Sequence, residues 1–405
     1  MSDATPRRHG DQTAIPCWFM RGGTSRGPFF RATDLPAAER ERDAVLLAVM
    51  GSPHPLQVDG VGGGHPLTSK VGIVGLSEQP DIDLEFRFAQ LQPDSDRVDT
   101  RANCGNMLAA VVPFAIESGL ITADGDTTTA RVLTLNTGMA ADITVRTSLA
   151  EDGYRYVDYG GDARIDGAPG TAAPVTIAFL DTAGSVASAL LPTGRVRDTV
   201  EADGVGEVQV TLIDNGQPLV VIAAADLGRT GRETPEQLNA DEDLKGKLES
   251  LRMVCGEAMG LGDVTQKNYP KMTLVAPPAE GGSITTRSFI PHVCHESIGV
   301  LAAVTVATAC VLPGSVAADV AELGGTGPDG AFDGEAGGDI TVAVEHPSGE
   351  FSVDLSVEAG DPPIVTRSAL LRTARLIMAG TAFVPGNLLE HEAGITTTQT
   401  TEAHA

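Results

Sequence analysis

The sequence predicts an α+β protein of two similar domains, in each of which a β-sheet wraps around one central helix. Short runs rich in Val, Ile and Thr recur along most of the 405 residues. One strongly apolar helical stretch lies in each half, and a lysine-bearing strand precedes each of these helices. With many strands and a single apolar helix per half, the sheet is the layer that covers the helix.

Eleven short apolar runs are expected to be strands, because most are four to eight residues long, rich in β-branched residues and bounded by Gly, Pro or Asp. In chain order they are Ile15–Met20, Val71–Leu76, Leu84–Leu91, Arg131–Leu135, Ile143–Thr147, Val175–Phe179, Val208–Ile213, Leu219–Ala223, Thr273–Val275, Ile340–Val344 and Phe351–Val357.

Four segments are expected to be helices. Leu35–Met50 follows Asp34, a residue type suited to capping. Gly105–Ser118 and Asn239–Met259 are the next two, the latter with acidic residues near its start. Ser297–Val311 is the most apolar and is expected to be buried on most sides.

The two apolar helices begin alike. Cys104-Gly-Asn-Met-Leu-Ala-Ala and Ser297-Ile-Gly-Val-Leu-Ala-Ala share the Leu-Ala-Ala register. The lysines of the preceding strands, Lys70 and Lys271, are about 200 residues apart. This weak internal similarity indicates two similar halves, and a chance likeness of short stretches is the alternative.

The length is typical of two or three domains. From the repeat we expect an N-terminal domain at residues 14–192 and a C-terminal domain at 193–386. The polar ends, 1–13 and 387–405, are expected to be mobile.

The composition excludes several classes of function. Lys and Arg number 28 against 54 Asp and Glu, which gives a formal net charge of −26 at pH 7. Such a surface repels phosphate backbones and anionic lipids, so neither a nucleic-acid nor a membrane partner is expected. The five cysteines include no C-x-x-C pair, and no signal-peptide pattern is visible at the N-terminus. We expect a cytoplasmic protein with reduced thiols and no metal site, in which an anionic ligand needs a local trap of N–H groups and cations.

Cys104 and Lys70 are the strongest candidates for chemistry in the N-terminal half. A thiol at the first turn of a helix meets unpaired N–H groups and the positive end of the helix dipole, and both favour the thiolate. Asn103 and Asn106 add donors beside it, and Gly105 lets a ligand approach the backbone. Lys70 lies in an otherwise apolar strand, where desolvation makes a lysine a candidate general base. The alternatives are a buried structural cysteine and a solvent-facing strand lysine.

The segment Met20-Arg-Gly-Gly-Thr-Ser-Arg-Gly is suited to close backbone contact with an anion, and Arg21 is a partner for a carboxylate. Thr24 and Ser25 lie within it, and Ser69 supplies another hydroxyl beside the candidate lysine. The segment also contains G-x-S-x-G, the pattern of a serine-hydrolase elbow. That elbow needs a helix directly after it, whereas the following Pro-Phe-Phe is typical of an extended segment, so a serine hydrolase is the less favoured alternative.

In the C-terminal half, Ser297 is expected at the same kind of helix N-terminus as the candidate cysteine, and two such ends make a trap for carboxylates if the halves close on each other. Lys271 has the weaker case, because Tyr-Pro-Lys is equally typical of a strand entry. Arg287 is a second candidate clamp for a carboxylate. His292 and His295 are further substrate-binding candidates without a third ligand at metal spacing. A histidine that caps the helix is the alternative for His295.

Seven short motifs stand out as a set: Arg21-Gly-Gly-Thr-Ser, Met50-Gly-Ser-Pro, Leu67-Thr-Ser-Lys-Val, Asn103-Cys-Gly-Asn, Ile213-Asp-Asn-Gly, Arg287-Ser-Phe-Ile-Pro-His and Glu345-His-Pro-Ser-Gly. Together they resemble the 4-oxalomesaconate tautomerase and 2-methylaconitate cis-trans isomerase family. The resemblance extends from about Ile15 to Val384, which is nearly the whole chain.

The resemblance implies the diaminopimelate epimerase-like fold, with two similar domains and the active site in the cleft between them. It also implies a proton shift on an unsaturated di- or tricarboxylate without a cofactor, with the oxalomesaconate branch of gallate and protocatechuate degradation as the nearest. The base lysine of the family matches Lys70, and its cleft cysteine matches Cys104. Arg26 and Gly64-His65 depart from the lysine and the Ala-Asp expected in that branch, which leaves the identity of the substrate open.

The expected chemistry is an allylic or keto–enol isomerisation. Lys70 removes a proton from carbon, a bound carboxylate or keto oxygen takes up the charge, and Cys104 is the acid or a donor that steadies the anion. The alternatives are a cis–trans isomerase of an aconitate-like acid, a two-base racemase (disfavoured by Ser297 where a second thiol is needed) and a carboxylate-binding protein without turnover. The expected partners are the small-molecule substrate and a second copy of the chain.

Overall fold

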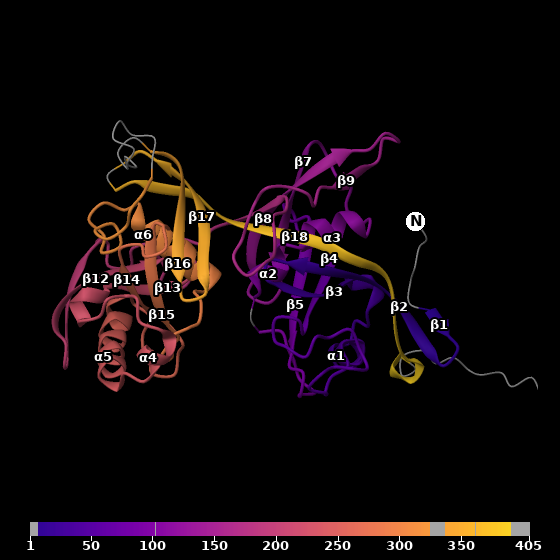
Figure 1. The fold of residues 1–405 in the computed structure, drawn as a ribbon, viewed down its shortest axis with the longest axis horizontal. Helices are drawn as coiled ribbons and strands as arrows, with labels where there is room; N and C mark the ends of the chain where they lie inside the picture. The colour runs from indigo at the N-terminus through magenta and orange to yellow at the C-terminus, as the bar shows by residue number, and fades with distance from the viewer. Residues whose placement is uncertain (1–6, 102, 325–336, 361, 390–405) are drawn as a thin grey trace, which may run out of the picture. The chain divides into compact units, whose positions relative to one another are not determined.

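The computed structural model describes residues 7–101, 103–324, 337–360 and 362–389 (Figure 1). The chain divides into two compact units. Unit 1 comprises the chain up to residue 138, residues 145–159 and the chain from residue 374; unit 2 comprises residues 139–144 and 160–373. The division therefore falls near residue 160 and not at the expected 192/193. The C-terminal segment returns to unit 1 because residues 374–385 pair with an N-terminal strand.

Unit 1 consists mainly of strands. Its elements are β1 (Arg7–His9), β2 (Gln12–Gly22), β3 (Ser25–Arg31), α1 (Glu39–Met50), β4 (Lys70–Leu76), β5 (Leu84–Leu91), β6 (Val98–Asp99), α2 (Gly105–Leu108), α3 (Val111–Glu117), β7 (Thr127–Thr134), the end of β8 (Met139–Leu149), whose first part belongs to unit 2, β9 (Arg155–Val157) and the end of β18 (Ile364–Pro385). Strand β2 pairs antiparallel with β1, β3 and β18, β3 runs parallel to β4, and β4 pairs antiparallel with β5. Residues 7–13, expected to be mobile, instead belong to the β1–β2 hairpin, whereas residues 1–6 and 390–405 lie outside the described part.

The sheet of unit 1 is covered by helices on both faces. Successive side chains of a strand point to opposite faces. Ile15, Val71 and Ala89 belong to the buried cluster on the α1 side. On the other face, the Phe29 ring lies 5.5 Å from the ring of Phe114 in α3. The sheet thus separates α1 from the central helices α2 and α3.

Two helices of unit 1 differ from the expected ranges, and a proline explains each difference. A residue before proline is driven to an extended conformation, and Leu35, which precedes Pro36, has φ −121° and ψ 155°. Helix α1 therefore begins only at Glu39. The helix expected at 105–118 is interrupted between α2 and α3, because the ring of Pro113 conflicts with a helical carbonyl four residues earlier, at Ala109.

Unit 2 has a second sheet with its own central helix (Figure 1). Its elements are β10 (Pro174–Phe179), β11 (Asp198–Ala202), β12 (Gly206–Asp214), β13 (Pro218–Ala223), α4 (Pro235–Asn239), α5 (Glu242–Ala258), β14 (Lys271–Ala276), β15 (Ile284–Phe289), α6 (Val300–Cys310), β16 (Gly338–His346), β17 (Gly349–Glu358) and the first part of β18. Strand β13 runs parallel to β14, while β12–β13, β14–β15 and β16–β17 are antiparallel pairs.

Helix α6 is the buried centre of unit 2, and residues 302–310 are all buried. It packs against β12, β13, β16 and β17. Helix α5 lies on the other face of the sheet, in a cluster with Leu212, Ile222 and Leu274. The helix expected from Ser297 begins only at Val300, with Gly299 as its N-cap. The one expected at 239–259 is α5, which begins at Glu242 with Asp241 as its cap, and the short helix α4 before it was not expected.

The predicted α+β class is confirmed, with a sheet and a central helix in each unit. All eleven predicted strands overlap strands of the structure. Among the described residues, no helix has the length and apolar character needed to cross a membrane.

Candidate functional site

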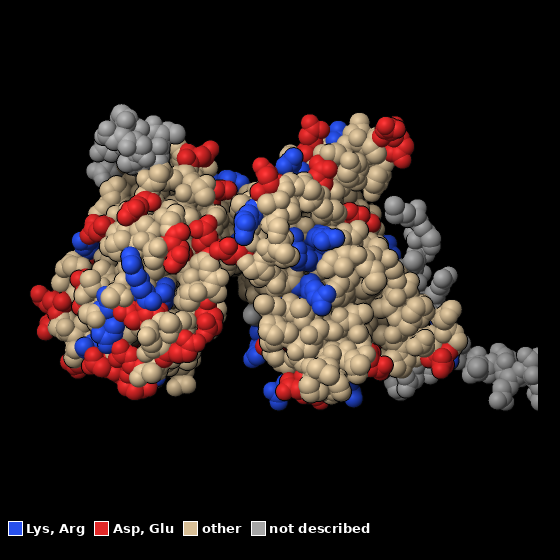
Figure 2. All heavy atoms as spheres, in the orientation of Figure 1, with Lys and Arg blue, Asp and Glu red and all other residues tan. Residues whose placement is uncertain are grey.

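The predicted site residues divide between the two units. Unit 1 holds Arg21, Thr24, Ser25, Ser69, Lys70, Asn103, Cys104, Gly105 and Asn106, whereas unit 2 holds Lys271, Arg287, His292, His295 and Ser297. Figure 2 shows acidic side chains spread over the visible surface and Lys and Arg gathered in small groups, as the net charge of −26 leads one to expect. An anionic ligand therefore depends on local groups of donors.

Lys70 begins β4 and faces the side of the sheet that carries α2 and α3. Its neighbour Val71 belongs to the cluster on the α1 side, so the alternation along the strand turns Lys70 to the opposite side. The residue is only 8% exposed. Its Nζ donates a hydrogen bond of 2.7 Å to Oε1 of Gln90 and lies 5.0 Å from the centroid of the Phe88 ring. The amine is thus held in place on the face of the central helices.

The backbone around Lys70 is packed tightly by a glycine of β3. A Cβ on Gly27 would lie 1.8 Å from the carbonyl oxygen of Lys70, so no other residue type fits there without displacing β4. The position of the lysine therefore depends on the glycine of the Arg21–Gly27 segment.

The turn between β2 and β3 packs on the first turn of α2. A Cβ on Gly22 would lie 2.2 Å from the carbonyl oxygen of Asn106, and Nδ2 of Asn106 donates 2.9 Å to Oγ1 of Thr24. Arg21 donates 2.7 Å from Nη1 to the carbonyl oxygen of Gly23, and burial together with the neighbouring Arg375 lowers its pKa. Helix α2 also packs against β4, the strand that begins with Lys70. The β2–β3 turn, β4 and α2 therefore form one contiguous group within unit 1.

Cys104 is the N-cap of α2, with φ −131° and ψ 99°, and Gly105 is the first helical residue. All five cysteines are free, and Cys104 is the one that is not buried. Burial raises the pKa of Cys17 and of Cys255 to about 12 and that of Cys294 to about 11, which makes these thiols poor acids and nucleophiles. Cys104 is thus the thiol suited to chemistry.

Three other predicted residues of unit 1 have distinct surroundings. Asn103 donates to Oγ1 of Thr134 at 3.1 Å, and its Oδ1 is buried without a hydrogen-bond partner among the described residues. The Ser25 hydroxyl, in a residue 1% exposed, also lacks a partner in that part of the chain. Ser69 is fully buried and donates 2.7 Å to Oε1 of Gln57, which also accepts from the Gly64 N–H.

Ser69 supports the loop before β4 through Gln57, and its role as a substrate ligand stays a prediction. The serine-hydrolase alternative is contradicted, because Ser25 opens strand β3, where the elbow needs a helix directly after the serine.

In unit 2, Lys271 begins β14 on the α6 side of the sheet. Its neighbour Met272 belongs to the cluster on the α5 side, so Lys271 points the other way. Its Nζ lies 3.4 Å from the position that a Cβ on Gly299, the N-cap of α6, would occupy. Burial lowers the pKa of Lys271 to about 8. The sequence alone supported Lys271 only weakly as a substrate-binding residue, and the burial of this lysine beside the N-cap of α6 strengthens that interpretation.

Ser297 lies beside two histidines. Its Oγ is 3.4 Å from Nε2 of His346, and its N–H donates 3.1 Å to Nδ1 of His295. Burial lowers the pKa of His346 to about 4, so this ring is neutral at physiological pH. The Ser348 N–H donates 3.3 Å to Nδ1 of His346, which leaves the ring proton on Nε2, facing Ser297. His346 was not a predicted site residue, although its Glu-His-Pro-Ser-Gly motif stood out.

Arg287 and His292 make their closest polar contacts elsewhere, although burial and the charge of Arg287 both lower the pKa of His346. Arg287 is directly opposite Leu274 of the α5-side cluster, so it faces away from Lys271. Its Nε donates 2.6 Å to the carbonyl oxygen of Glu233, and burial lowers its pKa. Nδ1 of His292 lies 3.5 Å from Oε2 of Glu249 in α5. Both residues thus contact the part of the chain around α4 and α5, and their role as substrate ligands stays a prediction.

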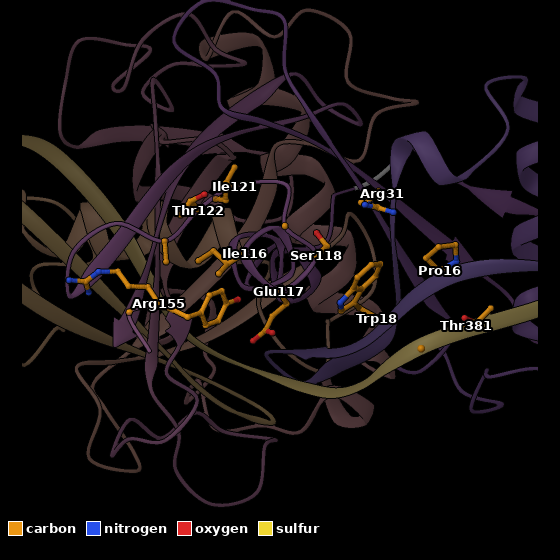
Figure 3. A pocket seen from close by; sticks show the side chains of 15 residues that line it. Pro16, Trp18, Arg31, Ile116, Glu117, Ser118, Ile121, Thr122, Arg155 and Thr381 are labelled. Carbon is orange, nitrogen blue, oxygen red and sulfur yellow. The ribbon is translucent and has the colours of Figure 1, made fainter. Parts of the chain in front are cut away.

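A separate pocket of about 810 Å³ in unit 1 contains none of the predicted site residues (Figure 3). Trp18, Glu117 and Arg155 are among its lining residues. The Tyr159 hydroxyl donates 3.1 Å to Oε1 of Glu117, and burial raises the pKa of that carboxyl. The candidate base Lys70 and the candidate thiol Cys104 are not among the residues that line this pocket.

The chain is similar to isomerases along almost its whole length. It is 52% identical over 379 residues to the (4E)-oxalomesaconate Delta-isomerase of Novosphingobium sp. (strain KA1), and the match covers 94% of this chain and 100% of that protein. It is 51% identical to the 4-oxalomesaconate tautomerase of Pseudomonas putida (strain KT2440), over 91% of this chain and 96% of that protein. The crystal structure of a methylitaconate-delta-isomerase matches with a TM-score of 0.78 at 32% identity, over 94% of this chain and 97% of that one.

The model of the PrpF protein family matches residues 12–385. The family resemblance inferred from the seven motifs is thereby confirmed, and the chain belongs to the PrpF family.

Proposed function

We propose that this isomerase shifts a proton on an unsaturated tricarboxylate, with 4-oxalomesaconate as its substrate, in the breakdown of aromatic acids such as gallate and protocatechuate. The observation that carries the proposal is the 52% identity over the full length of a (4E)-oxalomesaconate Delta-isomerase. The structure adds that Lys70 is buried on the face of the sheet that packs against α2, the helix capped by Cys104.

Lys70 is the base of the proposed reaction. Its uncharged amine takes a proton from the carbon next to the conjugated system and becomes an ammonium, and the C–H electron pair enters that system. The double bond then shifts, and the proton returns at the other end of the system, on carbon or on the keto oxygen. Only a proton changes position, so the reaction needs neither a redox cofactor nor a group carrier.

The intermediate of this reaction is an anion, and donors that point at its oxygens lower its energy. In unit 1 we assign this role to Arg21, Thr24, Asn106 and the Ser25 hydroxyl, which has no partner of its own among the described residues. Cys104, the accessible thiol, is the acid or a further donor. In unit 2 we propose Lys271 and Ser297 as carboxylate ligands, with His295 and the neutral His346 holding the serine.

A methyl-branched unsaturated acid is the second candidate substrate. The chain is 35% identical to the 3-methylitaconate isomerase of Eubacterium barkeri, over 92% of this chain and 98% of that protein. The lower identity makes such acids the runner-up.

We further propose that the enzyme works in the cytoplasm. Its five free thiols fit a reducing compartment. A second copy of the chain is the proposed partner, which sedimentation of the purified protein tests directly.

The decisive experiment follows the ultraviolet absorbance of the conjugated product with 4-oxalomesaconate and with 3-methylitaconate, for the native chain and for Lys70→Ala. We expect turnover of 4-oxalomesaconate by the native chain and a loss of about 10²–10⁴-fold in kcat for Lys70→Ala, the range that general acid–base transfer contributes. Lys247→Ala, which removes a lysine of α5 paired with Asp243, is the matched control and should remain active. Near-normal turnover by Lys70→Ala would refute the assignment of the base.

A further inference from the structure

We propose that Gln90 is a positioning residue for Lys70: it fixes the direction of the amine and stabilises the ammonium that forms when the lysine takes up a proton. The inference rests on the proposed function, in which Lys70 is the base.

The pairing of β4 with β5 places the two side chains together. Lys70 and Gln90 are directly opposite each other in this antiparallel pair. Opposite residues point to the same face of a sheet and lie in contact. The 2.7 Å hydrogen bond from Nζ to Oε1 is therefore built into the register of the sheet.

The amide of Gln90 has only one orientation that satisfies its surroundings. Its Nε2 donates to the carbonyl oxygens of Pro66, Ser69 and Leu91 at 3.1, 3.0 and 3.2 Å. A carbonyl oxygen is an acceptor only, so the NH₂ group must face these three and Oε1 must face the amine. Three backbone groups thus hold an acceptor against the lysine.

The amine of Lys70 is in contact with neutral groups that can accept from or attract a cation. An amide oxygen accepts a stronger hydrogen bond from an ammonium than from an amine, and the face of Phe88 attracts a cation. Among the described residues, no carboxylate forms an ion pair with Lys70.

One charged residue on a neighbouring strand shares the face of Lys70: Asp99 of β6 is directly opposite Gln90, and its carboxylate pairs with Arg101 at 2.7 Å. The others point elsewhere. Glu85 and Arg87 of β5 alternate with Phe88 and so face the other side of the sheet. Arg26 of β3 is exposed, with its guanidinium 5.6 Å from the ring of Phe19. The groups that directly contact the Lys70 amine, Gln90 and Phe88, are therefore neutral, and the carboxylate of Asp99 on the same face is paired with Arg101.

The test compares Gln90→Met, which keeps the length of the side chain without its polar atoms, with Gln90→Glu. Gln209→Met is the matched control, because Gln209 is an exposed strand glutamine of β12 bonded to Thr199. For each protein, kcat and KM for 4-oxalomesaconate are measured from pH 5 to 10, together with the melting curve and the affinity for tricarballylate, an unreactive tricarboxylate.

We expect kcat of Gln90→Met to fall about 10- to 100-fold, the effect of one hydrogen bond to a charged group, with KM and tricarballylate affinity within about threefold of the native values. The acidic limb of the pH–rate profile should move to lower pH in Gln90→Met and to higher pH in Gln90→Glu, because the first removes an acceptor from the ammonium and the second adds a counter-charge. Gln209→Met should match the native enzyme.

Three results overturn the proposal: unchanged kcat in Gln90→Met, acidic limbs that move in the same direction in both variants, or loss of folded structure in both, which would make Gln90 merely structural. If Lys70→Ala is inactive while Gln90→Met is normal, only the role of Gln90 fails. If Lys70→Ala stays active, the proposed function itself fails.

Discussion

Replacement of Lys271 by methionine is expected to stabilise the protein at neutral pH and to lose that effect in alkali. Burial lowers the pKa of Lys271 from its ordinary value of 10.5 to about 8, so the folded state holds the proton less tightly than the unfolded chain does. Each tenfold difference in proton affinity corresponds to about 1.4 kcal/mol, which makes the penalty for the buried charge roughly 3 kcal/mol below pH 8. Methionine fills a similar volume without the charge.

The sign of the pH dependence follows from the same difference. Between pH 8 and 10.5 the unfolded chain carries the proton and the folded protein does not, so the native protein gains stability relative to Lys271→Met as pH rises. Urea unfolding followed by circular dichroism at pH 7, 9 and 10.5 measures the difference. Lys247→Met, at a lysine of α5 paired with Asp243, is the control for the loss of a positive charge from this acidic chain. A difference between native and Lys271→Met that is the same at all three pH values would refute the desolvation of this amine.

Two further substitutions test unit 1. Cys104→Ser keeps a donor at the N-cap of α2 but lowers the acidity of that donor, so kcat should fall about 10- to 100-fold, less than for Lys70→Ala. A loss in steady-state kcat as large as that of Lys70→Ala, or larger, would make the thiol indispensable. Gly27→Ala places a Cβ 1.8 Å from the carbonyl oxygen of Lys70. We expect the free energy of unfolding in urea to fall by about 1–3 kcal/mol and kcat to fall as well. An unaltered unfolding midpoint would show that β3 and β4 have room for the methyl group.

The local features of the fold could be predicted from the sequence. Runs rich in β-branched residues predicted eleven strands, because such residues fit a pleated surface whatever surrounds them. The missed strands include β15 (Ile-Thr-Thr-Arg-Ser-Phe) and β18, which carry polar side chains. Strand β15 pairs with the preceding strand β14 and with β16, and β18 pairs with β2 near the other end of the chain. The first helix begins at Glu39, later than the expected Leu35, because Pro36 holds Leu35 in an extended conformation.

The sequence by itself determined the family, the candidate lysine and the candidate cysteine, since these depend on residue type and short-range spacing. Only the tertiary structure decided which polar groups surround them. Gln90 lies opposite Lys70 through strand register, and Arg287 faces away from Lys271 because adjacent positions of paired strands alternate between faces. Ser69 is bound to Gln57 through a loop closure. Burial, which sets the proton affinity of Lys271 and His346, is a property of packed elements and cannot be assigned to a residue from its neighbours in the chain.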